Sequence, residues 1–354
     1  MLAAVRLRPM SVRDVIVEAI RTRGTIGFDE FMELALYGEG GYYDEPPVGV
    51  DGDFVTSPHV HPVFAELVAR ALTELHALAG APSPFLLTEV GAGDGTLARG
   101  LLPHLEPIRP TYVAVERTPG ARRSLAGVDG IEVRDRLPDT SHVLIANELL
   151  DNLSFRRLRG TEDGTREVVV GLDGDRLVER LIEGDDGAPP LDPGEEVVVP
   201  AGALAFVEDL AARLTRPGYA LLIDYGGVGE PGGVAHGYRA HRPVEDLLDR
   251  PGETDITAGV DLGAIADRAE HAGLVAFPPV TQRAALTALG FDRWIRDELE
   301  RQTRQLDRRE GLEAVRTWSG RSRATLLVDP TALGRLRWLL LATPGSPPPG
   351  WIRP

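Results

Sequence analysis

The feature that most constrains the fold is a glycine-rich turn between an apolar strand and a helix. The sequence predicts a buried strand in F-L-L-T-E-V at 85–90, a turn in G-A-G-D-G-T at 91–96, and a helix in L-A-R-G-L-L-P-H-L at 97–105. Glycines at three alternate positions of the turn permit positive φ and a close approach of the backbone to a ligand. In open α/β folds, such a strand-turn-helix junction is where ligands bind.

Four further apolar strands, separated by helices or loops, are predicted at 111–116, 131–133, 141–148 and 219–226. Their apolar runs are continuous rather than alternating, which is typical of strands covered by helices on both faces. We therefore expect an α/β fold with a doubly wound, mostly parallel sheet. A chain of 354 residues with 43% hydrophobic residues is long enough for one large or two ordinary domains.

The remaining chain is arranged around this core. Short β-type runs joined by an L-D-G-D turn predict an inserted antiparallel patch within 155–199. Beyond Gln282 the chain is arginine-rich and helical to about Trp318, and a last strand follows at 335–342. The proline- and glycine-rich end is expected to be disordered. The predicted divisions are an N-terminal helical, cleft-covering segment at 1–82, the first half of the core at 83–154, the insertion with its helix at 155–215, the second half of the core at 216–280, a helical extension with the last strand at 281–345, and a tail at 346–354.

Composition excludes several kinds of chemistry. The chain has no cysteine and no lysine, so all 38 basic residues are arginine. Disulfides, thiolate nucleophiles, iron-sulfur clusters, lysine Schiff bases and the P-loop are therefore excluded. The net charge of -16 disfavours nucleic acid as a partner. No apolar run approaches the ~18 residues of a membrane span and no signal peptide is evident, so we expect a cytoplasmic protein with no membrane partner.

The glycine turn could hold either of two nucleoside ligands. A dinucleotide fingerprint needs glycine at 96, where this chain has Thr96, and Asp94 would repel a pyrophosphate at the helix N-terminus. S-adenosylmethionine is cationic, so Glu89 and Asp94 would complement it. Glu116, 25 residues after Gly91, could accept hydrogen bonds from ribose hydroxyls in either case. The combination favours S-adenosylmethionine over a dinucleotide.

The segment N-E-L-L-D at the end of the fourth strand is a candidate acceptor site. If Asn147 caps a following helix, Glu148 and Asp151 share one face of its first turn, where they could hold a cationic or proton-losing acceptor. Helix capping alone would favour the same residues. In H-V-H, His59 and His61 are more readily a locally bonded pair than metal ligands, and no metal is expected.

Several longer motifs resemble the MidA family of S-adenosylmethionine-dependent methyltransferases, which includes a mitochondrial protein arginine methyltransferase. The resemblance runs from about residue 25 to 341. It is carried by F-M-E-L-A-L with G-Y-Y, G-D-F-V-T-S-P, E-V-G-A-G-D-G-T-L, I-A-N-E-L-L-D, I-D-Y-G, D-I-T-A-G-V-D and V-T-Q. It implies a class I methyltransferase sheet, Rossmann-like, with its terminal strand inserted antiparallel. The chain departs from the family at His59, Pro62, His236 and Arg283.

The resemblance also implies site residues. Glu148 and Asp151 would face the acceptor. Apart from the resemblance, His59 or His61 could act as base if the acceptor is a small hydroxyl or amine, because an imidazole titrates near neutral pH. Together with the glycine turn, the residues expected at the cofactor are Glu89, Gly91, Ala92, Gly93, Asp94, Glu116, Arg117, Asp135, Asn147, Asp53, Thr56 and Ser57.

The expected function is transfer of a methyl group from S-adenosyl-L-methionine to a nitrogen or oxygen, with a protein arginine implied by the resemblance. A small-molecule O- or N-methyltransferase is one alternative. An assembly or binding protein that keeps the fold without catalysis is another, from a different class. The sequence specifies neither the acceptor nor the oligomeric state.

Overall fold

A computed structural model describes residues 10–44, 56–184, 188–229, 233–240 and 242–353. Its centre is an eight-stranded sheet with the strand order β16-β18-β10-β5-β2-β3-β4, in which β17 also pairs with β18. The strands are β2 (Leu86–Val90), β3 (Thr111–Val115), β4 (Ile131–Arg134), β5 (Ser141–Asn147), β10 (Leu214–Asp224), β16 (Val275–Ala276), β17 (Val280–Thr281) and β18 (Arg337–Ala342). Strands β10, β5, β2, β3 and β4 are parallel, and β18 runs antiparallel beside β10. The predicted doubly wound sheet is confirmed.

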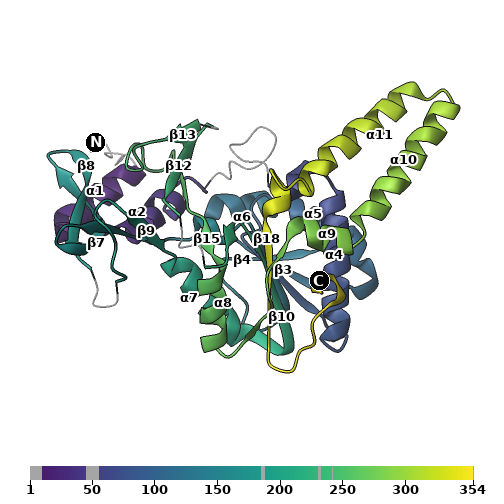
Figure 1. The fold of residues 1–354 in the computed structure, drawn as a ribbon, viewed down its shortest axis with the longest axis horizontal. Helices are drawn as coiled ribbons and strands as arrows, with labels where there is room; N and C mark the ends of the chain where they lie inside the picture. Colours follow the sequence, from purple (N-terminus) through teal and green to yellow (C-terminus); the bar gives the residue numbers. More distant parts are fainter. Residues whose placement is uncertain (1–9, 45–55, 185–187, 230–232, 241, 354) are drawn as a thin grey trace, which may run out of the picture.

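Helices cover both faces of this sheet (Figure 1). Helices α4 (Val63–Leu78), α5 (Thr96–Leu105) and α9 (Gln282–Ala288) belong to the hydrophobic core on one face, and α7 (Ala201–Arg213) and α8 (Leu262–His271) to the core on the other. In β10, Leu221 and Ile223 enter the first core while Ala220 and Leu222 enter the second. This explains why the strand sequences are continuously apolar.

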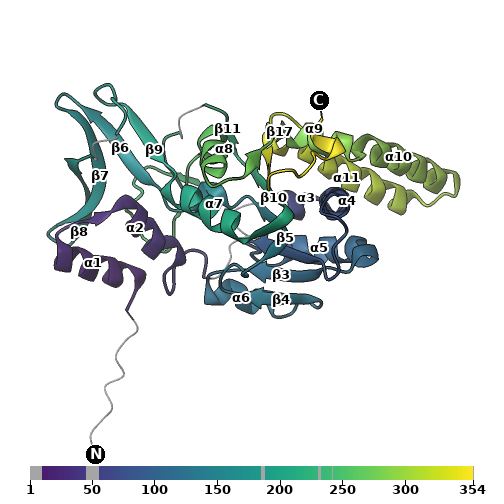
Figure 2. The ribbon, with the colours of Figure 1, turned by 90° about the horizontal axis from the view of Figure 1, so that it is seen from below.

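A smaller domain combines the N-terminal segment of the chain with the strands inserted after β5. It contains α1 (Val12–Arg23), β1 (Ile26–Gly27), α2 (Phe28–Met32) and a π-helix at Glu33–Tyr37, together with the insertion strands β6 (Arg156–Thr161), β7 (Gly164–Asp173), β8 (Arg176–Glu183) and β9 (Glu196–Val199). Strand β1 pairs with β7, and both regions share one hydrophobic core. A small sheet of β12 (His236–Arg239), β13 (Arg242–Val244) and β14 (Asp255–Thr257) packs against it. Figure 2 shows this domain at one end of the molecule.

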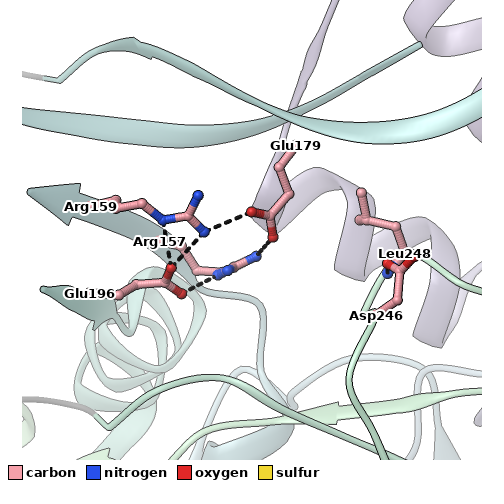
Figure 3. Close-up of polar contacts among 6 residues, drawn as sticks. All are labelled: Arg157, Arg159, Glu179, Glu196, Asp246 and Leu248. Carbon is pink, nitrogen blue, oxygen red and sulfur yellow. Dashed lines mark hydrogen bonds and ion pairs between the residues drawn. The ribbon is translucent and has the colours of Figure 1, made fainter. Parts of the chain in front are cut away.

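A network of buried ion pairs connects the insertion strands (Figure 3). Arg157 of β6 donates to Glu196 of β9 at 2.7 Å and to Glu179 of β8 at 2.5 Å. Arg159 contacts the same two carboxylates at 2.8 and 2.7 Å. The Arg157 guanidinium also stacks over Phe28 of α2, 4.5 Å from the ring centre. This arginine therefore holds three strands and the N-terminal segment together.

The C-terminal region differs from expectation in its tail. Helices α10 (Phe291–Asp307) and α11 (Gly311–Ala324) form a hairpin that projects from the core. The tail, expected to be disordered, packs on the core: Trp351 is buried edge-on against Trp338, and the Tyr219 hydroxyl donates to the Pro347 carbonyl. That prediction was wrong because one buried tryptophan outweighs the proline and glycine composition around it. Among the described residues, no helix is long and apolar enough to cross a membrane.

Candidate functional site

A cavity of about 1140 Å³ lies at the carboxyl ends of the central parallel strands, between the sheet and the small domain. Its lining includes the glycine turn after β2, the residues that follow β3 and β5, and the tyrosines Tyr37 and Tyr43 from the small domain. The carboxyl edge of an open α/β sheet is the position that topology assigns to a ligand.

The glycine turn has the geometry that close ligand approach requires. Gly91, Gly93 and Gly95 have φ values of 71°, 56° and 79°. A Cβ on Gly91 would lie 2.9 Å from the Leu149 side chain, so the position has no room for one. The Gly93 N–H donates to Glu116 Oε2 at 3.1 Å, which ties the turn to the end of β3. The turn therefore brings backbone groups and the Glu116 carboxylate to one wall of the cavity.

Acidic groups dominate this half of the cavity. Glu89 is buried, the Tyr112 hydroxyl donates to its Oε2 at 2.6 Å, and burial raises its pKa to about 8. Burial also raises the pKa of Glu116. Asn147 Oδ1 is a buried acceptor with no donor in the described part of the chain. These groups fit a ligand with an ammonium group and ribose hydroxyls, and they oppose a pyrophosphate.

Most of the residues predicted for the cofactor line this cavity. They are Glu89, Gly91, Ala92, Gly93, Asp94, Glu116, Arg117, Asp135, Asn147 and Thr56. Asp53 lies outside the described residues. Ser57 is fully buried in α3 (Ser57–Val60), and its hydroxyl bonds to Gln282 rather than facing the cavity. The side chain of Ser57 is therefore a structural contact in this arrangement.

The segment after β5 corrects one prediction. No α-helix follows Asn147: Glu148 has a φ of 51°, and the chain makes only a 3-10 turn at Leu150–Asn152. Asp224, at the end of β10, accepts hydrogen bonds from the Leu149 and Leu150 N–H groups at 3.0 and 2.6 Å. Asp224 thus satisfies backbone donors that Asn147 was expected to cap. Glu148 and Asp151 nevertheless both line the cavity.

The other half of the cavity contains a cluster of carboxyl groups, of which Asp255 is buried and Glu148 and Asp151 are half-buried. Burial raises the pKa of Glu148 to about 7, of Asp151 to about 6 and of Asp255 to about 7. Asp224 lies behind Asp151, and burial and the neighbouring charge raise its pKa well above the usual value.

Specific donors hold each of these carboxyl groups in place. Glu148 Oε1 accepts hydrogen bonds from the Ser57 N–H at 2.9 Å and from Asn147 Nδ2 at 3.1 Å. Asp255 Oδ1 accepts from the Tyr43 hydroxyl at 2.8 Å. Asp151 Oδ2 accepts from the Thr257 hydroxyl at 3.2 Å.

Two stacked tyrosines form the wall contributed by the small domain. The rings of Tyr37 and Tyr43 lie 5.4 Å apart, and the Tyr37 hydroxyl donates to the Asn152 carbonyl at 2.9 Å. On the outer side, the Arg117 guanidinium lies 4.2 Å from the Tyr37 ring centre and pairs with Glu33. The residue after the Glu116 carboxylate is thus tied directly to the small domain.

The two histidines have separate environments. The ring nitrogens of His59 are both occupied, Nδ1 by the Thr56 hydroxyl at 2.8 Å and Nε2 by Asp94 Oδ2 at 3.1 Å. His61 does not line the cavity; its Nδ1 accepts from the Val63 N–H, and its ring packs on Trp294. His59 lines the cavity and His61 does not, and a role as acceptor base stays a prediction.

Sequence reasoning missed Asp255, Tyr37, Tyr43 and Gln282. Asp255 opens the D-I-T-A-G-V-D motif, whose last residue, Asp261, caps α8. The tyrosines are more than 90 residues from Glu148 in the chain, and nothing in their spacing predicts the contact. Gln282 lies in the V-T-Q motif, which was the available signal in the sequence. The structure shows that its side chain is fully buried.

Comparison with known proteins agrees with this geometry. A family model described as S-adenosyl-L-methionine-dependent methyltransferase (Methyltransf_28) matches residues 67–280. The chain is similar to the mitochondrial protein arginine methyltransferase NDUFAF7 of Xenopus tropicalis, with 28% identity over 78% of this chain and 75% of that protein. The human NDUFAF7 is 27% identical over 77% of this chain and 72% of its own length.

A solved structure is similar over nearly the whole chain. It is a superfamily member from Burkholderia thailandensis bound to S-adenosyl-homocysteine, 25% identical, with a TM-score of 0.82 and coverage of 96% of this chain and 94% of that one. The cavity, its acidic lining and these matches agree, and the chain belongs to the MidA family of S-adenosyl-L-methionine-dependent methyltransferases.

Proposed function

We propose that this methyltransferase acts on a guanidinium nitrogen of a protein arginine. The observation that carries the proposal is the cluster of the buried Asp255 with the half-buried Glu148 and Asp151, three carboxyl groups with raised pKa values in one half of the cavity. Carboxyl groups buried without a cation are unfavourable in their charged form. A guanidinium, which has only donors and a permanent charge, complements them.

The cofactor would occupy the other half of the cavity. Glu116 would hold the ribose hydroxyls, Glu89 and Asn147 the amino group, and Asp135 would lie near the adenine, with the glycine turn against the ligand. Bound S-adenosyl-L-methionine supplies an electrophilic methyl group. Asp94 is already held by His59 and by the Thr96 N–H, so its contribution would be mainly to the shape and charge of the turn.

In the acceptor half, the chain would orient the guanidinium and receive one proton. Glu148 and Asp151 would bind its N–H groups by charge-assisted hydrogen bonds and direct one nitrogen toward the cofactor. Methylation of a guanidinium that stays cationic releases one proton. Glu148, with a pKa of about 7, is suited to accept it near neutral pH.

The relatives favour an arginine over a small hydroxyl acceptor, because the NDUFAF7 proteins are named protein arginine methyltransferases.

The test is incubation with methyl-labelled cofactor and host lysate, followed by separation into protein and small-molecule fractions. We expect labelled methylarginine in acid hydrolysates of the protein fraction. Glu148→Gln should lower the rate by about 100-fold or more while keeping cofactor affinity within a few-fold. Glu132→Gln, an exposed acid on β4, is the matched control and should retain full activity. Label confined to the small-molecule fraction would contradict the arginine proposal.

The pH dependence provides a second check. The pKa of Glu148 is raised, so its charged form, which binds the guanidinium and accepts the proton, is populated only as pH rises through about 7. The ratio kcat/KM should therefore rise with pH between about 6 and 8 and then level off. A profile that is flat over this range would exclude Glu148 as the group that must ionise.

A further inference from the structure

The segment directly after the Glu116 carboxylate supports the tyrosine wall of the cavity. Thr118 Oγ1 donates to the Tyr43 carbonyl at 2.9 Å, and the Gly120 N–H donates to Asp44 Oδ1 at 2.9 Å. A Cβ on Gly120 would overlap the Asp44 carbonyl oxygen, so the two backbones are in direct contact. Tyr43 is therefore held by the same stretch of chain that presents Glu116 to the cavity.

Arg117 extends this contact to the other tyrosine of the wall. Its guanidinium pairs with Glu33 and lies 4.2 Å from the Tyr37 ring centre. These two partners are the first and last residues of the π-helix at Glu33–Tyr37, and π-helical turns occur frequently at functional sites. A planar guanidinium can pair with a carboxylate and stack on an aromatic face at the same time. The side chain of Arg117 is thus engaged by the small domain.

The backbone of Arg117 is fixed to the cofactor side of the cavity. Its N–H donates to Glu116 Oε1 at 2.9 Å, and the Gly93 N–H donates to Oε2 at 3.1 Å. Arg122 Nη1 donates to the carbonyl groups of Glu116 and Arg117 at 3.0 and 2.7 Å. One residue therefore connects the carboxylate of the glycine-turn wall to the tyrosine wall, with its backbone on the first and its side chain on the second.

The tyrosine wall continues into the acceptor half of the cavity. Tyr37 and Tyr43 stack with their ring centres 5.4 Å apart and 19° between their planes. The Tyr43 hydroxyl donates to Asp255 Oδ1 at 2.8 Å, and Asn152 Nδ2 donates to the same oxygen at 3.2 Å. A displacement of the wall would therefore break the hydrogen bond that holds Asp255 or move this carboxyl group with it.

We propose that Arg117 is a positioning residue for methyl transfer, and that its contacts with Glu33 and Tyr37 fix the acceptor half of the cavity relative to the bound cofactor. Methyl transfer needs the acceptor atom in line with the methyl group, and a displacement of about 1 Å can cost about 100-fold in rate. The glycine turn belongs to the core and Tyr37 to the small domain, so their separation depends on contacts between these two parts. The inference requires methyl transfer, but not an arginine acceptor.

The experiment uses two variants of the full chain, each with a matched control. Arg117→Met removes the ion pair and the stacking but keeps the backbone N–H. Gly120→Ala forces the wall outward, because the added methyl group overlaps the Asp44 carbonyl oxygen. Arg268→Met removes a similarly exposed ion pair between α8 and α7. Gly127→Ala adds a methyl group where no other atom lies within 4 Å.

Two measurements separate catalysis from cofactor binding. The initial rate of label transfer from methyl-labelled S-adenosylmethionine to host lysate, at saturating cofactor, should fall by about tenfold or more in Arg117→Met and Gly120→Ala. Calorimetry with S-adenosylhomocysteine should show an affinity within about twofold of the wild type in Arg117→Met, because the groups that hold Glu116 remain. Both controls should retain the wild-type rate.

A distance measurement on the protein alone tests the structural step without an acceptor. The chain has no cysteine, so Asp129→Cys and Asp163→Cys provide one exposed spin-label site on the core and one on the small domain. The labels should give one narrow distance distribution in the otherwise unchanged chain and in both controls. The distribution should broaden or shift in Arg117→Met and in Gly120→Ala.

Three results would overturn the proposal. An unchanged rate or an unchanged distance distribution in Arg117→Met would show that other contacts hold the wall. A loss of S-adenosylhomocysteine affinity in proportion to the rate would make Arg117 a cofactor ligand instead. An equal loss of rate in Arg268→Met would reduce the effect to a general loss of stability. By contrast, a methylated product other than methylarginine would contradict the proposed acceptor and leave this inference intact.

Discussion

At the scale of single residues, the cavity is lined by carboxyl groups that are buried or half-buried in the absence of a ligand. Glu89 stands in the cofactor half, and Glu148, Asp151 and Asp255 in the other. Burial raises the pKa of all four, because a charged carboxylate is poorly solvated there. Cation binding should therefore be coupled to proton release.

The first prediction concerns Glu89 and the cofactor. Its pKa of about 8 means that it is mostly protonated at pH 7 without ligand. A bound ammonium group would lower that pKa, so cofactor binding at pH 7 should release close to one proton, and release should diminish above pH 9. Calorimetry in buffers of different ionisation enthalpy measures this number. Glu89→Gln should abolish most of the release; an unchanged release in this variant would assign the proton to another group.

The second prediction concerns Gln282, which does not touch the cavity. Its side chain is fully buried and bonds to the Ser57 hydroxyl, to the Leu327 and Leu333 carbonyls and to Trp338 Nε1. The Ser57 N–H in turn donates to Glu148. Gln282 is therefore a positioning residue that holds α3 against the acceptor carboxylate.

Gln282→Met keeps the volume and removes these bonds. It should cost about 1–3 kcal/mol of stability. It should also move the rise of kcat/KM to higher pH, because α3 is then less firmly held and the Ser57 N–H, which lowers the pKa of Glu148, lies less closely against that carboxylate. Gln302→Met on α10 is the control. A loss of stability with an unmoved pH limb would limit Gln282 to a structural role.

At the scale of elements, the sequence predicts a helix or strand correctly where neighbouring residues determine it, and fails where a distant residue does. Helix α5 and the core strands carry their own apolar pattern, and they form close to where the sequence predicted them. The segment after β5 does not: Asp224, 73 residues beyond Asp151, caps it in place of the expected helix. The small domain similarly joins β1 to β7 across about 140 residues.

The third prediction tests the ion-pair network that connects these elements. Arg157 is buried and pairs with Glu179 and Glu196. Arg157→Ala would leave Glu196 buried with one cation fewer, so we expect a loss of roughly 3 kcal/mol in unfolding free energy. Arg21→Ala removes an exposed pair with Asp175 and should change it by less than about 0.5 kcal/mol. Chemical denaturation measures both; equal effects would show that burial does not decide the strength of the pair.

At the scale of the whole molecule, net charge and cavity charge have the same sign. The chain carries -16, and acids line both halves of the cavity. Such a field attracts cationic substrates over distances longer than a hydrogen bond.

The fourth prediction follows from this field. For an arginine peptide with basic flanks, kcat/KM should fall by about tenfold from 20 to 300 mM salt, while kcat stays nearly constant, because salt screens the encounter and not the bound complex. A peptide with acidic flanks should show the opposite salt dependence. Steady-state kinetics at both salt concentrations checks this, and a parallel response of the two peptides would exclude steering.

The sequence by itself determined the sheet, the glycine turn and the acidic character of the cofactor half, because these depend on periodicity and on residues a few positions apart. It also identified Glu148 and Asp151 by their motif, although for a helix that does not form. Only the tertiary structure brought Asp255, Tyr37 and Tyr43 to the cavity, engaged both nitrogens of His59, and buried the C-terminal tryptophan. The physical reason is that each of these depends on contacts between residues distant in the chain, and their geometry is set by packing rather than by local spacing.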